Sequence, residues 1–193
     1  MTGRIASALL LGAVVAAQTP EPTWLDRPMS NWNVSGRAMP RAAINGETIA
    51  EISKRCALLP VMRSTSGERM VADAGWLPFH MFDRQIVQRD VEILGGLAGA
   101  DGMCRPVDFN VFVFVGGHLA GTLSPAEMVS RTDASIAGGI RLADDDTIAA
   151  EFARYIETDA LCCPTGRVTV RYRIDRKATP PVVVPVGLQP TRR

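Results

Sequence analysis

The stretch Asp108-Phe109-Asn110-Val111-Phe112-Val113-Phe114-Val115 decides the fold class of this chain. It is rich in the aromatic and β-branched residues that favour a strand. The next two residues, Gly116-Gly117, accept the positive φ angles that a two-residue hairpin turn requires. Residues 118–124 then form the returning segment. The sequence therefore predicts a β-hairpin over residues 108–124.

The clearest alternation of apolar and polar residues lies at residues 168–175, and it predicts a half-buried antiparallel strand. The dry face of this strand would consist of Val168, Val170, Tyr172 and Ile174. Residues 147–156 fit both a helical face and a strand. A strand is favoured because an acidic turn precedes the segment and Cys162–Gly166 follows it, so that it can form a hairpin with 167–175.

Residues 182–186 predict an edge strand, where Pro185 is tolerated because an edge residue need not donate to a ladder. Several consecutive strands with few helices indicate the α+β class. We therefore expect a single small domain on an antiparallel β-sheet, with one or two short helices and two disulfides.

Two short helices are predicted before the strands. Residues 45–56 show the apolar spacing of an amphipathic helix. Residues 66–74 predict a second helix, because Thr65 and Glu68 have the spacing of a capping box and Gly75 stands where a C-terminal stop belongs.

Residues 18–44 are rich in proline, which resists both helix and central strand, and they predict an extended lead-in to a domain at 45–190. Trp24 and Trp32 are too large and apolar to be left in water without reason. We expect them to lay the lead-in across the domain surface or to cap an edge of its sheet.

Residues 1–17 have the pattern of a secretory signal peptide. Arg4 precedes an apolar run that is too short to cross the ~30 Å hydrocarbon core, and the run ends in the small residues Val15-Ala16-Ala17. The mature protein is expected to begin near Gln18 and to work in the periplasm or outside the cell. An uncleaved anchor is the alternative.

Charge and hydropathy argue against two classes of partner. The chain has 21 Lys and Arg residues against 20 Asp and Glu residues, so it supplies no basic face for nucleic acid. No segment after residue 17 approaches the ~20 consecutive apolar residues of a membrane-spanning helix. We expect neither nucleic-acid binding nor stable membrane insertion after signal removal.

An exported chain with Cys56, Cys104, Cys162 and Cys163 predicts two structural disulfides. Adjacent cysteines have Cα atoms about 3.8 Å apart, whereas a relaxed disulfide takes about 4.4–6.8 Å, so the adjacent pair should not bond to itself. Cys56 and Cys104 would then each reach one member of that pair, and both such connectivities stay open. The alternatives are a redox-active vicinal disulfide and a zinc site, although the adjacent cysteines lack the spacing of a ligand knuckle.

Recognised catalytic motifs are absent from the sequence, and we predict no catalytic residue, cofactor or metal ligand. Residues 95–102 are rich in glycine but lack the lysine and following helix of a phosphate-binding loop, so a flexible loop is predicted there. Residues 144–146 are an acidic triplet without the alternating spacing of calcium ligands, which favours a solvated turn.

Three segments carry a family resemblance. They read DGMCRP at 101–106, FVFVGGHLAGTLSP at 112–125 and DALCCP at 159–164. Together they resemble the LppP/LprE family of exported bacterial proteins, over roughly residues 75–175. The resemblance implies an envelope or secreted protein and supplies no catalytic residues. This chain lacks the lipid-bearing cysteine of the lipoprotein members, so membrane tethering is not expected.

The favoured function is a non-enzymatic exported protein that binds an envelope protein or a small ligand through loops on a disulfide-linked sheet. The candidate contacts are Arg105, Arg131 and Asp133, which stand in loop-like segments. Each of them could instead serve as solvated charge or in a salt bridge that holds a loop.

Two other functions stay open. The first is an envelope hydrolase in which His80 or His118 acts as general base beside Asp83 or Asp108. The second is a structural assembly subunit, which would show an exposed apolar patch around the two tryptophans of the lead-in.

Overall fold

The computed structural model describes residues 22–43, 46–58, 63–79 and 86–190. The signal-peptide prediction for residues 1–17 lies outside these residues, as do His80 and Asp83.

The described residues form two antiparallel sheets where the sequence indicated one. The first sheet contains β1 (Leu77–Phe79), β2 (Ile86–Gln88), β3 (Val91–Ala100), β4 (Pro106–Val115) and β5 (His118–Thr122). Its order is β1-β3-β4-β5, with β2 also paired to β3. The second sheet has the order β6-β7-β8-β9 and contains β6 (Ile136–Leu142), β7 (Thr147–Arg154), β8 (Gly166–Asp175) and β9 (Val182–Pro190).

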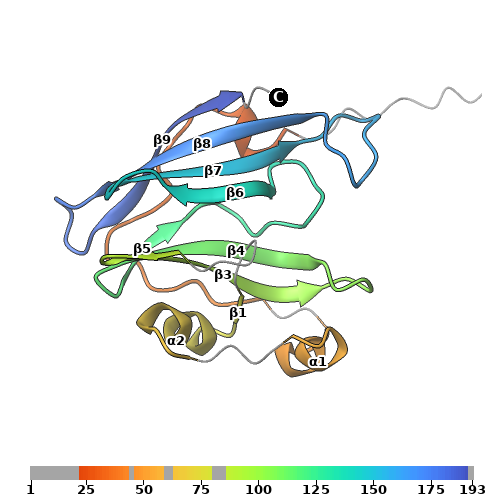
Figure 1. Cartoon of the computed structure of the whole chain (residues 1–193), viewed down its shortest axis with the longest axis horizontal. Helices are drawn as coiled ribbons and strands as arrows, with labels where there is room; N and C mark the ends of the chain where they lie inside the picture. The colour runs from red at the N-terminus through yellow and green to blue at the C-terminus, as the bar shows by residue number, and fades with distance from the viewer. Residues whose placement is uncertain (1–21, 44–45, 59–62, 80–85, 191–193) are drawn as a thin grey trace, which may run out of the picture.

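The two sheets stack face to face, and two short helices cover the outer face of the five-stranded sheet (Figure 1). These helices are α1 (Ile49–Arg55) and α2 (Ser66–Asp73), as predicted. Thr65 and Glu68 form the expected capping box, and Gly75 follows the last turn with a φ of +89°. The fold is of the predicted α+β class, with antiparallel sheets and two short helices.

The β4 strand is buried on both faces, which explains its nearly continuous apolar sequence. Val111 and Val113 face the four-stranded sheet in the main core, whereas Phe112 and Phe114 pack beneath α2 against Val71. The predicted hairpin is confirmed, since β4 pairs with β5 through a turn at residues 116 and 117, both with positive φ. A strand between two apolar layers has no wet face, so its sequence shows no polar alternation.

The prediction of a flexible glycine-rich loop at residues 95–102 is wrong. Residues 95–100 belong to β3, which pairs with β4 along most of its length. A Cβ atom on Gly96 would lie 3.1 Å from the Cβ of Trp76. The glycines therefore let aromatic side chains approach the strand closely. As a result, this strand has the glycine-rich composition that is typical of a loop.

The interpretation of residues 147–156 as a strand is confirmed by β7, which pairs with β8 from Thr147 to Arg154. The predicted edge strand is also present, and β9 extends it to Pro190. The β6 strand at Ile136–Leu142 was not anticipated. Its pairing with β7 is irregular between Ile136 and Ile140, which obscures the alternation that would have revealed it.

The predicted connectivity of the cysteines is wrong. Cys56 bonds to Cys104, with Cα atoms 5.5 Å apart, and Cys162 bonds to its neighbour Cys163, with Cα atoms 3.8 Å apart. The first bond joins the end of α1 to the turn between β3 and β4, in the layer of the five-stranded sheet. The adjacent pair lies in the loop between β7 and β8 of the other sheet, so the fold separates the predicted partners.

We predict that the two disulfides contribute unequally to stability. The Cys56–Cys104 bond spans a sequence separation of 48, and in the chain-entropy model a loop of this size adds about 4 kcal/mol at most. A double Cys56→Ser, Cys104→Ser variant should therefore unfold at clearly lower urea concentration. The matched Cys162→Ser, Cys163→Ser variant should change less, because its bond closes almost no chain. Equal losses, or a non-reduced peptide map that links Cys56 to Cys162 or Cys163, would contradict this pairing.

We predict that Tyr172 ionises only when the protein unfolds. Its hydroxyl is buried in the core and donates a hydrogen bond to the carbonyl oxygen of Leu123, and burial raises its pKa well above the ordinary value of about 10. The stability contributed by neutral Tyr172 is thus complete below pH ~10 and is lost as the pH rises towards the folded-state pKa. Absorbance at 295 nm in a Tyr155→Phe variant should rise together with the loss of circular dichroism. Reversible ionisation near pH ~10 in folded protein would disprove this.

Candidate functional site

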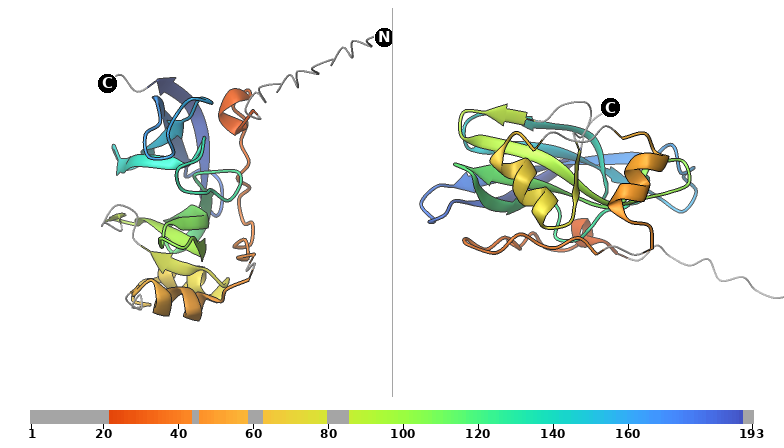
Figure 2. Two further views of the ribbon diagram at one scale, coloured as in Figure 1. Left: turned by 90° about the vertical axis from the view of Figure 1, so that its right-hand side faces the viewer. Right: turned by 90° about the horizontal axis from the view of Figure 1, so that it is seen from below.

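The lead-in runs along one side of both sheets (Figure 2). It begins with a 3-10 turn, η1 (Trp24–Asp26), beside the four-stranded sheet. Trp24 lies edge-on to Phe152 at a centroid distance of 5.1 Å, and Trp32 lies edge-on to Tyr172 at 6.3 Å. The tryptophans thus pack the lead-in onto the core, as expected. They do not form the broad exposed patch that was expected of an assembly subunit.

The side chain of Asn33 connects the edges of the two sheets. Its amide nitrogen donates to the carbonyl oxygens of Thr122, the last residue of β5, and Val183, in β9, each at 3.0 Å. Its amide oxygen accepts from the backbone nitrogen of Thr122 at 2.9 Å. The side chain is 7% exposed, so these bonds are shielded from water. Asn33 therefore fixes the lead-in at the junction of the sheets.

Gly121 provides the space for this contact. Its φ is +142°, and a Cβ atom there would overlap the amide group of Asn33. The glycine-threonine step of the returning strand is thus where the lead-in docks. No local sequence pattern indicates this contact, because the two residues are far apart along the chain.

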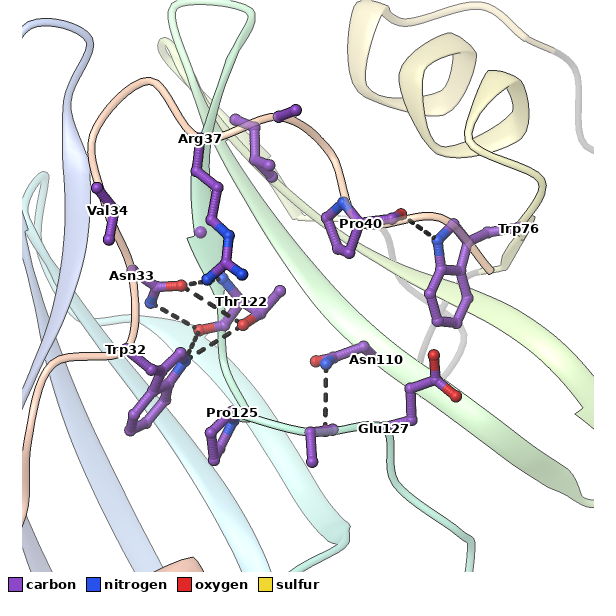
Figure 3. Close-up of a pocket in the computed structure, with 14 residues that line it drawn as sticks. Trp32, Asn33, Val34, Arg37, Pro40, Trp76, Asn110, Thr122, Pro125 and Glu127 are labelled. Atoms are coloured by element: carbon purple, nitrogen blue, oxygen red, sulfur yellow. Dashed lines mark hydrogen bonds between the residues drawn. The ribbon is translucent and has the colours of Figure 1, made fainter. Parts of the chain in front are cut away.

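A groove of about 550 Å³ lies between the lead-in and the segment that follows β5 (Figure 3). We call this cavity the lead-in groove. Its apolar lining includes Trp32, Val34, Pro40, Leu119, Pro125 and Ala126. Trp76 closes part of it and donates through its indole nitrogen to the carbonyl oxygen of Pro40 at 2.8 Å. The groove therefore has walls from two chain segments, and a hydrogen bond from Trp76 helps to hold the lead-in wall.

The lead-in groove also carries two charged side chains, Arg37 from the lead-in and Glu127 from the segment after β5. Figure 3 shows them on opposite walls, with Asn110 between. No ion pair joins them to each other or to another of the described residues. Partial burial, together with the charge of Asp108, raises the pKa of Glu127.

Asn110 is a buried polar residue whose amide group supports the wall of the groove. Its amide nitrogen donates to the carbonyl oxygens of Ser124 at 3.3 Å and Ala126 at 3.2 Å. These bonds hold the segment that carries Glu127 against β4. Asn110 therefore positions a charged group of the groove without needing to contact a ligand.

Residues 93–177 match the LppP/LprE lipoprotein family. The match confirms the family resemblance and covers β3 to β8, less than half of the chain. It indicates an exported, envelope-associated protein. No curated protein and no solved structure matches the chain.

The LppP/LprE match divides the lead-in groove. Asn110 and Glu127 lie within the matched segment, whereas Asn33, Arg37 and Trp76 lie outside it. The matched segment therefore includes one wall of the groove, and the lead-in and Trp76 supply the rest. This division explains why motif comparison alone did not point to the cavity.

The binding residues expected from the sequence do not line the lead-in groove. Arg105 pairs with Asp101 inside the turn between β3 and β4. Asp133 accepts hydrogen bonds from the backbone nitrogen of Tyr155 at 2.8 Å and from the side chain of Arg154 at 3.2 Å. Arg131 is exposed on a loop with a φ of +65°. Arg105 and Asp133 thus hold loops in place. This is the structural role that the sequence analysis gave as the alternative to ligand binding.

The proposed catalytic pair of His118 and Asp108 is not assembled. His118 is exposed and pairs with Val115 at the hairpin turn, while Asp108 lies near the other end of β4. Val115 and Asp108 are seven positions apart along the strand, about 23 Å at 3.3 Å per residue. A general base needs its carboxylate partner within hydrogen-bond reach, so this pair does not support the hydrolase hypothesis.

The acidic triplet at residues 144–146 lies in the turn between β6 and β7, as predicted. Asp146 pairs with Arg176, which also pairs with Asp90 at 2.7 Å. Among the described residues, no cluster of three or more His, Cys, Asp or Glu side chains could hold a metal ion. Within the same part of the chain, no helix is long and apolar enough to cross a membrane.

We predict that Asn33→Ala lowers the free energy of unfolding by about 3 kcal/mol, because it leaves buried carbonyl and amide groups without partners. Urea denaturation measures this loss. The matched control is Val34→Ala, next in sequence and exposed, which should change stability by less than about 0.5 kcal/mol. Equal effects of the two substitutions would show that the Asn33 contacts do not hold the sheets together.

Proposed function

We propose that this is an exported protein of the cell envelope that binds a small ligand in the lead-in groove. The observation that carries the proposal is the cavity itself, which has an apolar lining and two charged side chains without ion-pair partners among the described residues. Its volume of about 550 Å³ falls within the range of about 300–1,000 Å³ that is usual for small-molecule sites.

The construction of the groove favours binding in a preformed site. Asn33 holds the lead-in wall, and Asn110 holds the opposite wall, both through buried amide groups. A cavity whose walls are already fixed loses little conformational entropy when a ligand enters. The groove can therefore retain a ligand with modest contact area.

Three features support export. The LppP/LprE match associates the chain with envelope lipoproteins, and the four cysteines all form disulfides, which persist in oxidising compartments. The signal-peptide pattern at residues 1–17 adds the route. Fractionation of the native cells would test whether the protein works in the periplasm or outside the cell.

The test uses N-phenyl-1-naphthylamine, a neutral apolar dye that fluoresces when it leaves water. We expect the full-length exported protein to bind it saturably, because the groove offers an apolar lining. Ala126→Trp should weaken binding at least tenfold by filling the groove, in a fluorescence titration.

The matched control is Ala143→Trp, which adds the same side chain at an exposed position between β6 and β7. This variant should bind the dye as the parent protein does. If the dye does not bind saturably, or if both variants bind it equally well, the lead-in groove is not the ligand site and the proposal fails.

A further inference from the structure

Two opposite charges stand on opposite walls of the lead-in groove, and the fold leaves each of them without an ion pair among the described residues. Arg37 comes from the lead-in, and Glu127 comes from the segment after β5 (Figure 3). Elsewhere on the surface, arginines such as Arg154 and Arg176 each pair with two carboxylates. Other exposed arginines of the described residues, such as Arg141 and Arg171, also lack an ion pair, but Arg37 and Glu127 are the two charged residues that line the groove.

Glu127, at the acidic end of the groove, is exposed, and its pKa is raised. Partial desolvation, and secondly the negative charge of Asp108, are the causes of this rise. A cation placed there would favour the ionised form of Glu127, because an opposite charge stabilises a carboxylate.

The basic end of the groove has the complementary character. Arg37 lies above Asn33 and Thr122, whose polar groups are already engaged with each other (Figure 3). Its guanidinium group therefore has donors available for an incoming acceptor. A planar guanidinium binds carboxylate and phosphate oxygens in a bidentate manner.

We infer that the ligand of the groove is a small zwitterion, with an amine towards Glu127, an acidic oxygen group towards Arg37 and an apolar body between them. The inference rests on the proposed function and adds the chemical class of the ligand. The apolar body would lie over apolar residues of the groove lining, such as Pro40, Leu119 and Ala126. A short peptide with free ends and a phosphoethanolamine lipid headgroup share this chemistry.

The probes are the tripeptide Ala-Leu-Ala with free ends, its N-acetylated form, its C-amidated form, and dihexanoyl phosphatidylethanolamine. Their Kd values are measured by isothermal titration calorimetry on the full-length exported protein. We expect at least one zwitterionic probe to bind, and Arg37→Gln and Glu127→Gln each to weaken it at least tenfold. Binding of the free peptide indicates a peptide-type ligand, and binding of the lipid alone indicates a headgroup.

Blocking one charge of the ligand should remove the effect of the matching variant. If the peptide binds, Glu127→Gln should not weaken the acetylated form further, and Arg37→Gln should not weaken the amidated form further. For the lipid, dihexanoyl phosphatidylglycerol lacks the amine and should be insensitive to Glu127→Gln. The control variants Arg27→Gln and Glu157→Gln change exposed charges outside the groove and should leave every Kd within twofold.

Failure of the ligand class can be told apart from failure of the groove as a site. If no zwitterionic probe binds or competes with the apolar dye, while the dye still depends on Ala126, the site stands and the zwitterion inference is overturned. The inference is also overturned if the capped and free probes bind equally well to the parent protein and to both charge variants.

Discussion

The buried amide of Asn33 is the contact on which the arrangement of the molecule depends. Two β-sheets that stack through apolar side chains can slide over one another, because apolar contacts have little directionality. Asn33 removes this freedom by bonding to Thr122 at the edge of one sheet and to Val183 at the edge of the other. Tyr172 adds a second buried bond between the sheets, through the carbonyl oxygen of Leu123. The lead-in is therefore part of the core structure.

The β3–β4 hairpin separates two apolar layers, and this explains both a success and a failure of sequence interpretation. In β4, valines face one layer and phenylalanines face the other, so the segment is recognisable as a strand. In β3, glycines stand where the aromatic rings of Phe79, Trp76 and Phe112 approach the backbone. A composition typical of loops is here the consequence of close packing between a sheet and its aromatic cover.

The lead-in groove follows from the same architecture. Because the lead-in is fixed at Asn33 and again where Trp76 bonds to the carbonyl oxygen of Pro40, the intervening segment spans a gap instead of collapsing onto β5. Arg37 lies within this span. The sequence showed Arg37 and Glu127 only as ordinary surface charges, about ninety residues apart, and pointed to Arg105 and Asp133, which proved to hold loops. No local pattern could have identified the groove.

Local periodicity and capping in the sequence determined the two helices, the hairpin, β7, β8 and the edge strand, because these depend on residues within a few positions of each other. The LppP/LprE resemblance was likewise readable from short motifs. Only the tertiary structure decided the division into two sheets, the pairing of Cys56 with Cys104 and the lead-in groove. Each of these depends on contacts between distant residues, such as Asn33 with Val183, and a linear pattern does not encode which distant segments meet.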